Sequence, residues 1–127
     1  MGGSDLTALD GISGYRGPQG SLVGVFLGDA IPSNGPAPAT LDFTPAGLGI
    51  NFLTFSPELG QSFYTSTGEL QTFVAPPGTT HLFLGIPDGF GFIGTPGAYD
   101  DNDGSYRVRL GINAIPPAVP EPATLAL

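Results

Sequence analysis

Residues 81–112 read HLFLGIPDGFGFIGTPGAYDDNDGSYRVRLGI, and this stretch sets the expectation for the fold. His81 to Ile86 is a short apolar run that ends at a turn signal, as buried strands do. Ser105 to Ile112 alternates apolar with polar side chains, the pattern of a strand with one face in water. A glycine-rich, acidic loop joins the two. The stretch therefore predicts two short strands and no helix.

The composition extends this prediction to the rest of the chain. Its 21 glycines and 14 prolines are poor helix formers, whereas its 40% hydrophobic residues, nine of them Phe, are enough to fill a core. The aromatic side chains of Phe63, Tyr64 and Phe83 are expected in that core. Further strands are expected at residues 21–28, 48–55, 61–64 and 69–74.

Turn-rich connections separate these strands. Residues 1–20 offer little to bury except Leu6, Leu9, Ile12 and Tyr15, and the prolines of residues 30–40 favour an extended surface loop. Six or so short strands between turns predict one all-β domain, a β-sandwich over residues 1–113. Residues 114–127, AIPPAVPEPATLAL, are expected to form an extended, proline-rich tail.

The charge balance excludes several classes of partner. The chain has no lysine, only three arginines, and a net charge of −8, so it repels the phosphates of nucleic acids and of anionic membranes. Without cysteine it has no disulfide, no thiolate nucleophile and no Cys-ligated zinc. No apolar run approaches the length of a membrane span.

The acidic loop is the candidate binding site. Asp88, Asp100, Asp101 and Asp103 crowd together with Asn102, and crowded carboxylates repel one another unless a cation intervenes. Oxygen donors without thiol or imidazole suit Ca²⁺, which takes about 6–8 oxygens. The loop therefore predicts a calcium site. The alternative is a solvated turn, which Asp-Asn-Asp-Gly forms without any metal.

The same loop carries a family resemblance. PGAYDDNDGSYRV (residues 96–108), with SLVGVFLGD (21–29) and FVAPPGTTHLFLGIPDG (73–89), is similar to the calcium-dependent galactophilic lectins. The similarity covers roughly residues 20–112, and its second half carries most of the specificity. It implies a galactose-binding-like jelly roll in which one Ca²⁺ bridges the protein and sugar hydroxyls.

The resemblance also implies the ligands of that ion. Asp88, Asp101 and Asn102 correspond to residues that give side-chain oxygens, and Ala98 to one that gives its backbone carbonyl. Tyr15 is a loosely aligned counterpart of a further carbonyl ligand.

The chain departs from the family pattern at two places, and both concern the sugar more than the ion. The insert at residues 89–95 lengthens the gap after Asp88. The family loop whose His and Gln touch galactose is shortened, leaving Gln19 and no His. Phe90 and Phe92, between glycines of the insert, are candidates to stack on a sugar ring or on a neighbouring subunit.

The last nine residues carry a second resemblance. VPEPATLAL, Val119 to Leu127, looks like the opening of a PEP-CTERM sorting signal, without its membrane helix and basic cluster. Proteins with that signal are exported by bacteria that build exopolysaccharide, and they reside at the cell surface or in the extracellular matrix. The resemblance implies the same location for this chain.

Together these features predict a non-catalytic, exported domain that binds calcium and carbohydrate or exopolysaccharide. The single histidine, His81, lies in an apolar strand, and no G-x-S-x-G nucleophile motif is present, so an enzyme is not expected. The alternative is a structural subunit of a matrix or fibre in which calcium only stiffens the loop. In that case edge strands, the loop at residues 30–47 or the tail would mediate self-assembly.

Overall fold

The computed structural model describes residues 3–30, 35–97 and 105–113, and within them the chain is all-β, which confirms the predicted class. The proposed tail, residues 114–127, lies outside this description. The elements are β1 (Gly3–Leu6), β2 (Tyr15–Pro18), β3 (Val23–Leu27), β4 (Thr54–Phe55), β5 (Phe63–Tyr64), β6 (Thr72–Phe73), β7 (His81–Gly85), the single 3₁₀ turn η1 (Phe90–Phe92) and β8 (Ile93–Gly94).

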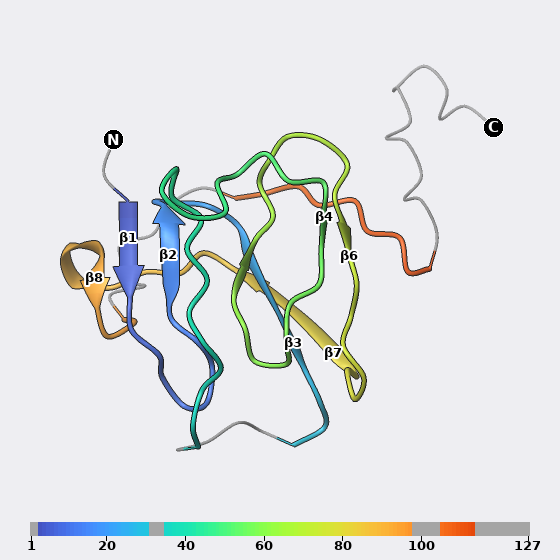
Figure 1. Ribbon diagram of the computed structural model, residues 1–127, viewed down its shortest axis with the longest axis horizontal. Coiled ribbons are helices and arrows are strands. Elements are labelled where there is room, and N and C mark those ends of the chain that lie inside the picture. The colour runs from blue at the N-terminus through green and yellow to red at the C-terminus, as the bar shows by residue number, and fades with distance from the viewer. Residues whose placement is uncertain (1–2, 31–34, 98–104, 114–127) are drawn as a thin grey trace.

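The strands form three small sheets, which Figure 1 shows side by side. One has the order β2-β1-β8, with β1 antiparallel to β2 and parallel to β8. The second has the order β5-β3-β7 and is antiparallel throughout. The third is the parallel pair β4-β6. This arrangement is compatible with a β-sandwich.

An aromatic cluster joins the sheets, and Phe43 lies at its centre. Phe43 is 0% exposed, and its ring lies 5.6 to 6.2 Å from the rings of Tyr15, Phe52, Phe55 and Tyr64. Such ring pairs add to the free energy gained from burial alone. Burial also raises the pKa of the Tyr15 phenol to about 12, because the phenolate loses its hydration in the core.

Phe43 comes from a connection and not from a named strand. Its backbone N–H donates to the carbonyl of Arg16, 2.8 Å away, and Asp42 forms an isolated parallel bridge with Arg16. The connection therefore extends the edge of β2, which seats the ring of Phe43 against β2 and β5.

The first twenty residues are more ordered than the sequence predicts. They contain β1 and β2, and burial alternates along β2, with Tyr15 and Gly17 inside and Arg16 outside. Leu6 of β1 is also buried. A four-residue strand holds only two inward side chains, so the sequence pattern is too short to stand out from the surrounding turns.

The strand predicted at residues 48–55 is largely absent, since only β4 at its end forms. The backbone N–H groups of Gly47 and Gly49 both donate to the carbonyl of Thr44, and Gly49 has a φ of +70°. These turns occupy the backbone groups that a strand ladder would need. The strands predicted at residues 21–28, 61–64, 69–74 and 81–86 are present, although each is shorter than expected.

The strand predicted at Ser105–Ile112 is not formed in the structure. Residues 105–110 are all exposed, and none of them belongs to a strand of the described sheets. The Tyr106 hydroxyl donates to the carbonyl of Gly20, which fixes the start of the segment. Alternation predicts a strand only where a sheet edge is available to pair with it.

The prediction that Phe83 lies in the core is wrong, although Phe63 and Tyr64 are buried as expected. Phe83 points away from the aromatic cluster and is 53% exposed. Successive side chains of a strand point to opposite faces, and Phe83 of β7 lies on the face that no described element covers.

Candidate functional site

Asp88 occupies a fixed position at the start of the acidic loop. It follows β7 by three residues and is only 6% exposed. One carboxylate oxygen, Oδ1, accepts a hydrogen bond from the N–H of Gly89 at 2.7 Å. An ionised carboxylate has about four lone-pair sites, so capacity remains for a cation or a hydroxyl group.

The insert after Asp88 closes on itself. The N–H of Gly97 donates to the carbonyl of Asp88 at 2.9 Å, and Gly89 bridges antiparallel to Pro96. The sequence implies that the insert separates Asp88 from the later acidic residues. In the structure, its two ends meet, and Gly97 lies beside Asp88.

The loop between these ends rests on the N-terminal strand. The N–H of Phe92 donates to the carbonyl of Gly89 at 2.8 Å, forming η1, and β8 then pairs with β1. The N–H of Thr7 donates to the carbonyl of Gly94 at 2.8 Å. A Cβ on Gly89 would lie 2.8 Å from Cδ2 of Leu6, so this position requires glycine for close packing against β1.

These supporting residues, Leu6 and Gly89, are absent from the sequence-based site. The sequence offers one weak signal for them, the glycine directly after Asp88.

Phe92 is held in an unusual conformation at the tip of this loop. Its φ is +63°, a region that costs a non-glycine residue roughly 1–2 kcal/mol, and its side chain is 39% exposed. The exposed aromatic ring fits the predicted stacking role. The side chain of Phe90 lies outside the described residues.

Tyr15 and Gln19 lie on and just after β2. Leu6 of β1 pairs with Tyr15 on one side and with Gly94 of β8 on the other, so β1 separates Tyr15 from the loop. The side chain of Tyr15 is buried, with its hydroxyl 3.4 Å from the carbonyl of Pro18. The structure thus does not place Tyr15 directly beside β8. Its role as a carbonyl ligand stays a prediction, as does a sugar contact by the half-buried Gln19.

The remaining predicted ligands, Ala98, Asp101 and Asn102, lie outside the described residues, as do Asp100 and Asp103. Within the described ranges, no three His, Cys, Asp or Glu side chains group closely enough to hold a metal ion. The calcium site therefore stays a prediction, and Asp88 is its one described side-chain ligand.

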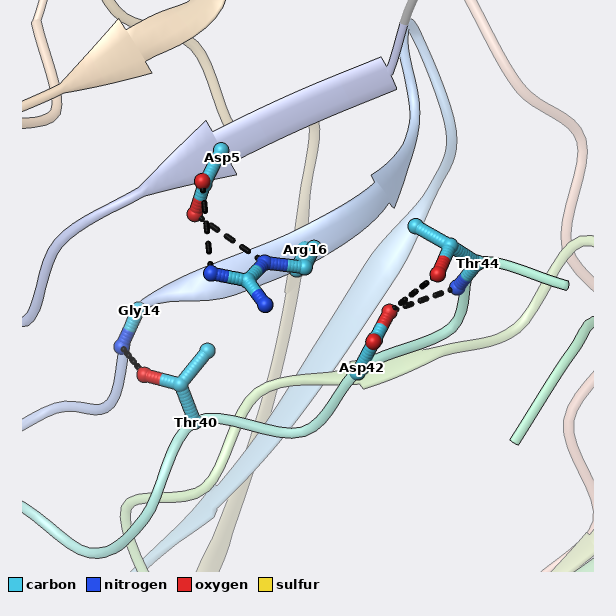
Figure 2. A network of polar contacts seen from close by, with 6 residues as sticks. All are labelled: Asp5, Gly14, Arg16, Thr40, Asp42 and Thr44. Atoms are coloured by element: carbon cyan, nitrogen blue, oxygen red, sulfur yellow. Dashed lines mark hydrogen bonds and ion pairs between the residues drawn. The ribbon is translucent and has the colours of Figure 1, made fainter. Parts of the chain in front are cut away.

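A second polar cluster, shown in Figure 2, lies on β1, β2 and the connection that contains Phe43. The Nε and Nη2 atoms of Arg16 each lie 3.3 Å from a carboxylate oxygen of Asp5. Oδ1 of Asp42 accepts from the Thr44 hydroxyl at 2.6 Å and from its N–H at 2.9 Å. These bonds lower the pKa of Asp42, with a smaller contribution from Arg16. The groups satisfy one another, which indicates a structural role.

His81 is exposed at the start of β7. Its Nδ1 lies 2.8 Å from the hydroxyl of Thr80, and its ring stacks on Phe83 at 5.9 Å. Neither neighbour is a nucleophile paired with an acid, so these contacts indicate no catalytic constellation around the histidine.

Comparisons with protein-family models, with curated proteins and with solved structures find no match. Over the described residues, none of the helical segments has the length and apolar character needed to cross a membrane. Both resemblances named above therefore rest on the sequence motifs alone.

Proposed function

We propose that this chain is an exported, non-catalytic domain that binds carbohydrate through a calcium ion, built on a jelly-roll β-sandwich. The single observation that supports it best is the closure of the insert, in which Gly97 donates to the carbonyl of Asp88. Gly97, the last described residue before the acid-rich stretch of sequence, is thus hydrogen-bonded to the backbone of Asp88. The seven extra residues of the insert therefore do not prevent Asp88 from sharing a site with the acidic residues that follow the insert.

In this proposal Asp88, Asp101 and Asn102 hold the ion with their side-chain oxygens, and Ala98 contributes its carbonyl. Calcium, when bound, supplies coordination positions that neutral sugar hydroxyls can occupy. The carboxylate of Asp88 accepts hydrogen bonds from those hydroxyls. Phe92 adds an exposed ring against which the apolar face of a sugar can pack.

Export is supported by the motif at Val119–Leu127, which also suggests an extracellular polysaccharide as the ligand. Each sugar contact is weak, so useful affinity requires several copies displayed together. Fractionation of the source cells, followed by detection of the domain with an antibody, tests this location. Recovery from the cytoplasm alone would contradict it.

A calcium titration with two matched variants tests the site. Calcium at a hundred times its dissociation constant adds about 2.7 kcal/mol to the free energy of unfolding, equivalent to a Tm increase of roughly 10 °C. Asp88→Asn keeps the size of the side chain and its acceptor for Gly89 but removes the charge. Asp29→Asn makes the same change at an exposed position after β3.

We expect calcium, but not an equal concentration of magnesium, to raise the Tm of wild type and Asp29→Asn, and EGTA to reverse the increase. Asp88→Asn should lose most of it. An equal calcium effect in both variants would refute the role of Asp88. A glycan array probed with and without EGTA then tests the sugar: calcium binding without any glycan signal would favour the structural alternative.

A further inference from the structure

The strand β7 ends the second sheet. In the order β5-β3-β7 it has β3 on one side, and no described strand lies on the other (Figure 1). The devices that usually protect such an edge are missing within it, since the strand reads HLFLG, without proline, lysine or an acidic side chain. Phe83 is 53% exposed and Leu84 is 39% exposed. An apolar edge of this kind is a template for one more strand.

The register of the sheet shows which backbone groups of β7 point to the open edge. The carbonyl of Leu22 accepts a hydrogen bond, 3.2 Å long, from the residue that follows β5, so Leu22 directs its backbone groups toward β5. Successive residues of an antiparallel strand alternate in this direction, so Val25, three residues on, directs its groups toward Phe83 of β7. Leu82 and Leu84, on either side of Phe83, therefore direct their N–H and C=O groups to the open edge.

A second β7 fits this edge with matching groups. Antiparallel pairing centred on Phe83 sets Phe83 opposite its own copy and Leu82 opposite Leu84. Each Leu82–Leu84 pair then exchanges both of its N–H···O bonds. Opposite residues share a face of the sheet, so ring meets ring on one face and leucine meets leucine on the other. The two Phe83 residues form a non-hydrogen-bonded pair, the kind whose side chains are closest.

Charge favours a second copy as the occupant of this edge. All eleven acidic residues, Asp100, Asp101 and Asp103 included, lie outside residues 70–87, which also hold no lysine or arginine. The neighbouring strands β3 and β5 read VGVFL and FY, likewise without charge. Asp88 follows β7 closely and is only 6% exposed. Two copies with a net charge of −8 repel one another elsewhere, and at this sheet the repulsion is weakest.

We propose that two copies of this chain associate through β7 about a two-fold axis at Phe83. The two sheets become one, with the strand order β5-β3-β7-β7-β3-β5. The same surface is used on both molecules, so the assembly closes at two copies. This proposal does not depend on the calcium site, and its tests are carried out in EGTA as well as in calcium. If the proposed function holds, a dimer also engages a repeating polymer at two points.

Sedimentation of the full chain at increasing concentration measures the association. A five-residue edge is small beside the roughly 1,200–2,000 Å² of a stable interface, so we expect a dissociation constant of about 10 μM to 1 mM. Leu84→Pro removes an outward N–H that the sheet does not use, which an edge strand tolerates, and Leu84→Ala is the matched control that keeps it. Circular dichroism verifies that both variants fold.

We expect Leu84→Pro to associate at least about tenfold more weakly than Leu84→Ala, because the missing donor is lost twice, once in each copy. Equal association of these two variants overturns the proposal. So does a wild type that stays monomeric at about 1 mM, since another apolar strand would then be the occupant of the edge.

A charge exchange at Phe83 tests the two-fold axis without touching the core. Phe83→Lys and Phe83→Glu each place like charges opposite one another in the dimer, and we expect each variant alone to associate at least about tenfold more weakly than wild type. An equimolar mixture sets opposite charges face to face and should recover the association. A mixture that associates no better than the separate variants overturns the proposal.

A disulfide identifies the contact directly, because the chain contains no cysteine. In a non-hydrogen-bonded pair the Cα atoms lie about 4.5 Å apart, within the range of about 4.4–6.8 Å that a disulfide spans. We expect Phe83→Cys to form a disulfide-linked dimer in high yield on mild oxidation. Leu70→Cys, at an exposed position before β6, is the control and should give a low yield. Equal yields overturn the proposal.

Discussion

Replacing Gly89 with alanine tests how the candidate site is supported. The backbone at Gly89, with φ −165° and ψ 160°, is accessible to alanine, so the cost arises from packing alone. The new Cβ would lie 2.8 Å from Cδ2 of Leu6 and 3.0 Å from the carbonyl oxygen of Thr95, whereas ordinary carbon contacts are about 3.5–4.0 Å. Leu6 is 3% exposed and has little room to move.

Overpacking of this kind typically costs about 1–3 kcal/mol, and alanine returns about 0.4–1 kcal/mol by restricting the unfolded chain. We therefore expect Gly89→Ala to lower the free energy of unfolding by roughly 1–2 kcal/mol in urea titrations followed by circular dichroism. Gly97→Ala is the matched control, because no described atom lies within 4 Å of its Cβ. It should be neutral or slightly stabilising.

The double variant Leu6→Ala/Gly89→Ala identifies the cause of the loss. If Leu6 is the obstructing group, the two substitutions together should cost less than the sum of their separate effects. Gly89→Ala should also weaken calcium binding more than Gly97→Ala, because it disturbs the loop that brings Gly97 to Asp88. Equal stability of the Gly89→Ala and Gly97→Ala proteins would refute the packing argument.

Three further predictions follow from the core and the polar cluster. Phe43→Ala should lower the free energy of unfolding by about 4 kcal/mol, since four ring contacts are lost, whereas Phe83→Ala should lower it by under about 1 kcal/mol. Urea titration measures both values, and similar losses would contradict the assignment of the core. The pKa of Tyr15 is raised from 10.0 to about 12, so stability should fall as the pH rises from 10 to 12; phenolate absorbance that reports every tyrosine titrating near pH 10 would contradict this. The pKa of Asp42 is lowered, so the contribution of Asp42 to folding stability is present above the ordinary carboxylate pKa and is lost on acidification. Thr44→Val should return the pKa of Asp42 toward its ordinary value in a carboxyl NMR titration. An unchanged pKa would mean that the hydrogen bond from the Thr44 hydroxyl does not cause the shift.

The sequence predicts the strands that bury apolar runs and misses those whose partners lie far away in the chain. The apolar run around Val23 is enough to identify β3, because consecutive apolar side chains pack on both sides of it. β1 depends on residues near Gly94 and Tyr15 for its two neighbours, and β4 on Phe73, so no local pattern reveals them. Ser105–Ile112 is the converse case, a good local pattern that joins none of the described sheets.

The sequence predicts the chemical groups of the candidate site, but not the backbone hydrogen bond and the packing that hold its loop in place. The acidic residues and the glycines around them identify a loop suited to a hard cation. The closure of the insert depends on a hydrogen bond between the backbones of Asp88 and Gly97 and on packing against Leu6, eighty-odd positions earlier. Backbone bonds carry no side-chain signature, and the contact with Leu6 requires knowledge of the sheet order.

The position of β1 in the middle of its sheet has a consequence for biosynthesis. One of its neighbours, β8, is the last of the described strands to be synthesised, about ninety residues after β1 itself. At about 5–20 residues per second, β1 waits several seconds with one edge unpaired. Docking of β2 covers only the opposite edge of β1, so a chaperone or another segment would have to shield the edge that β8 later fills.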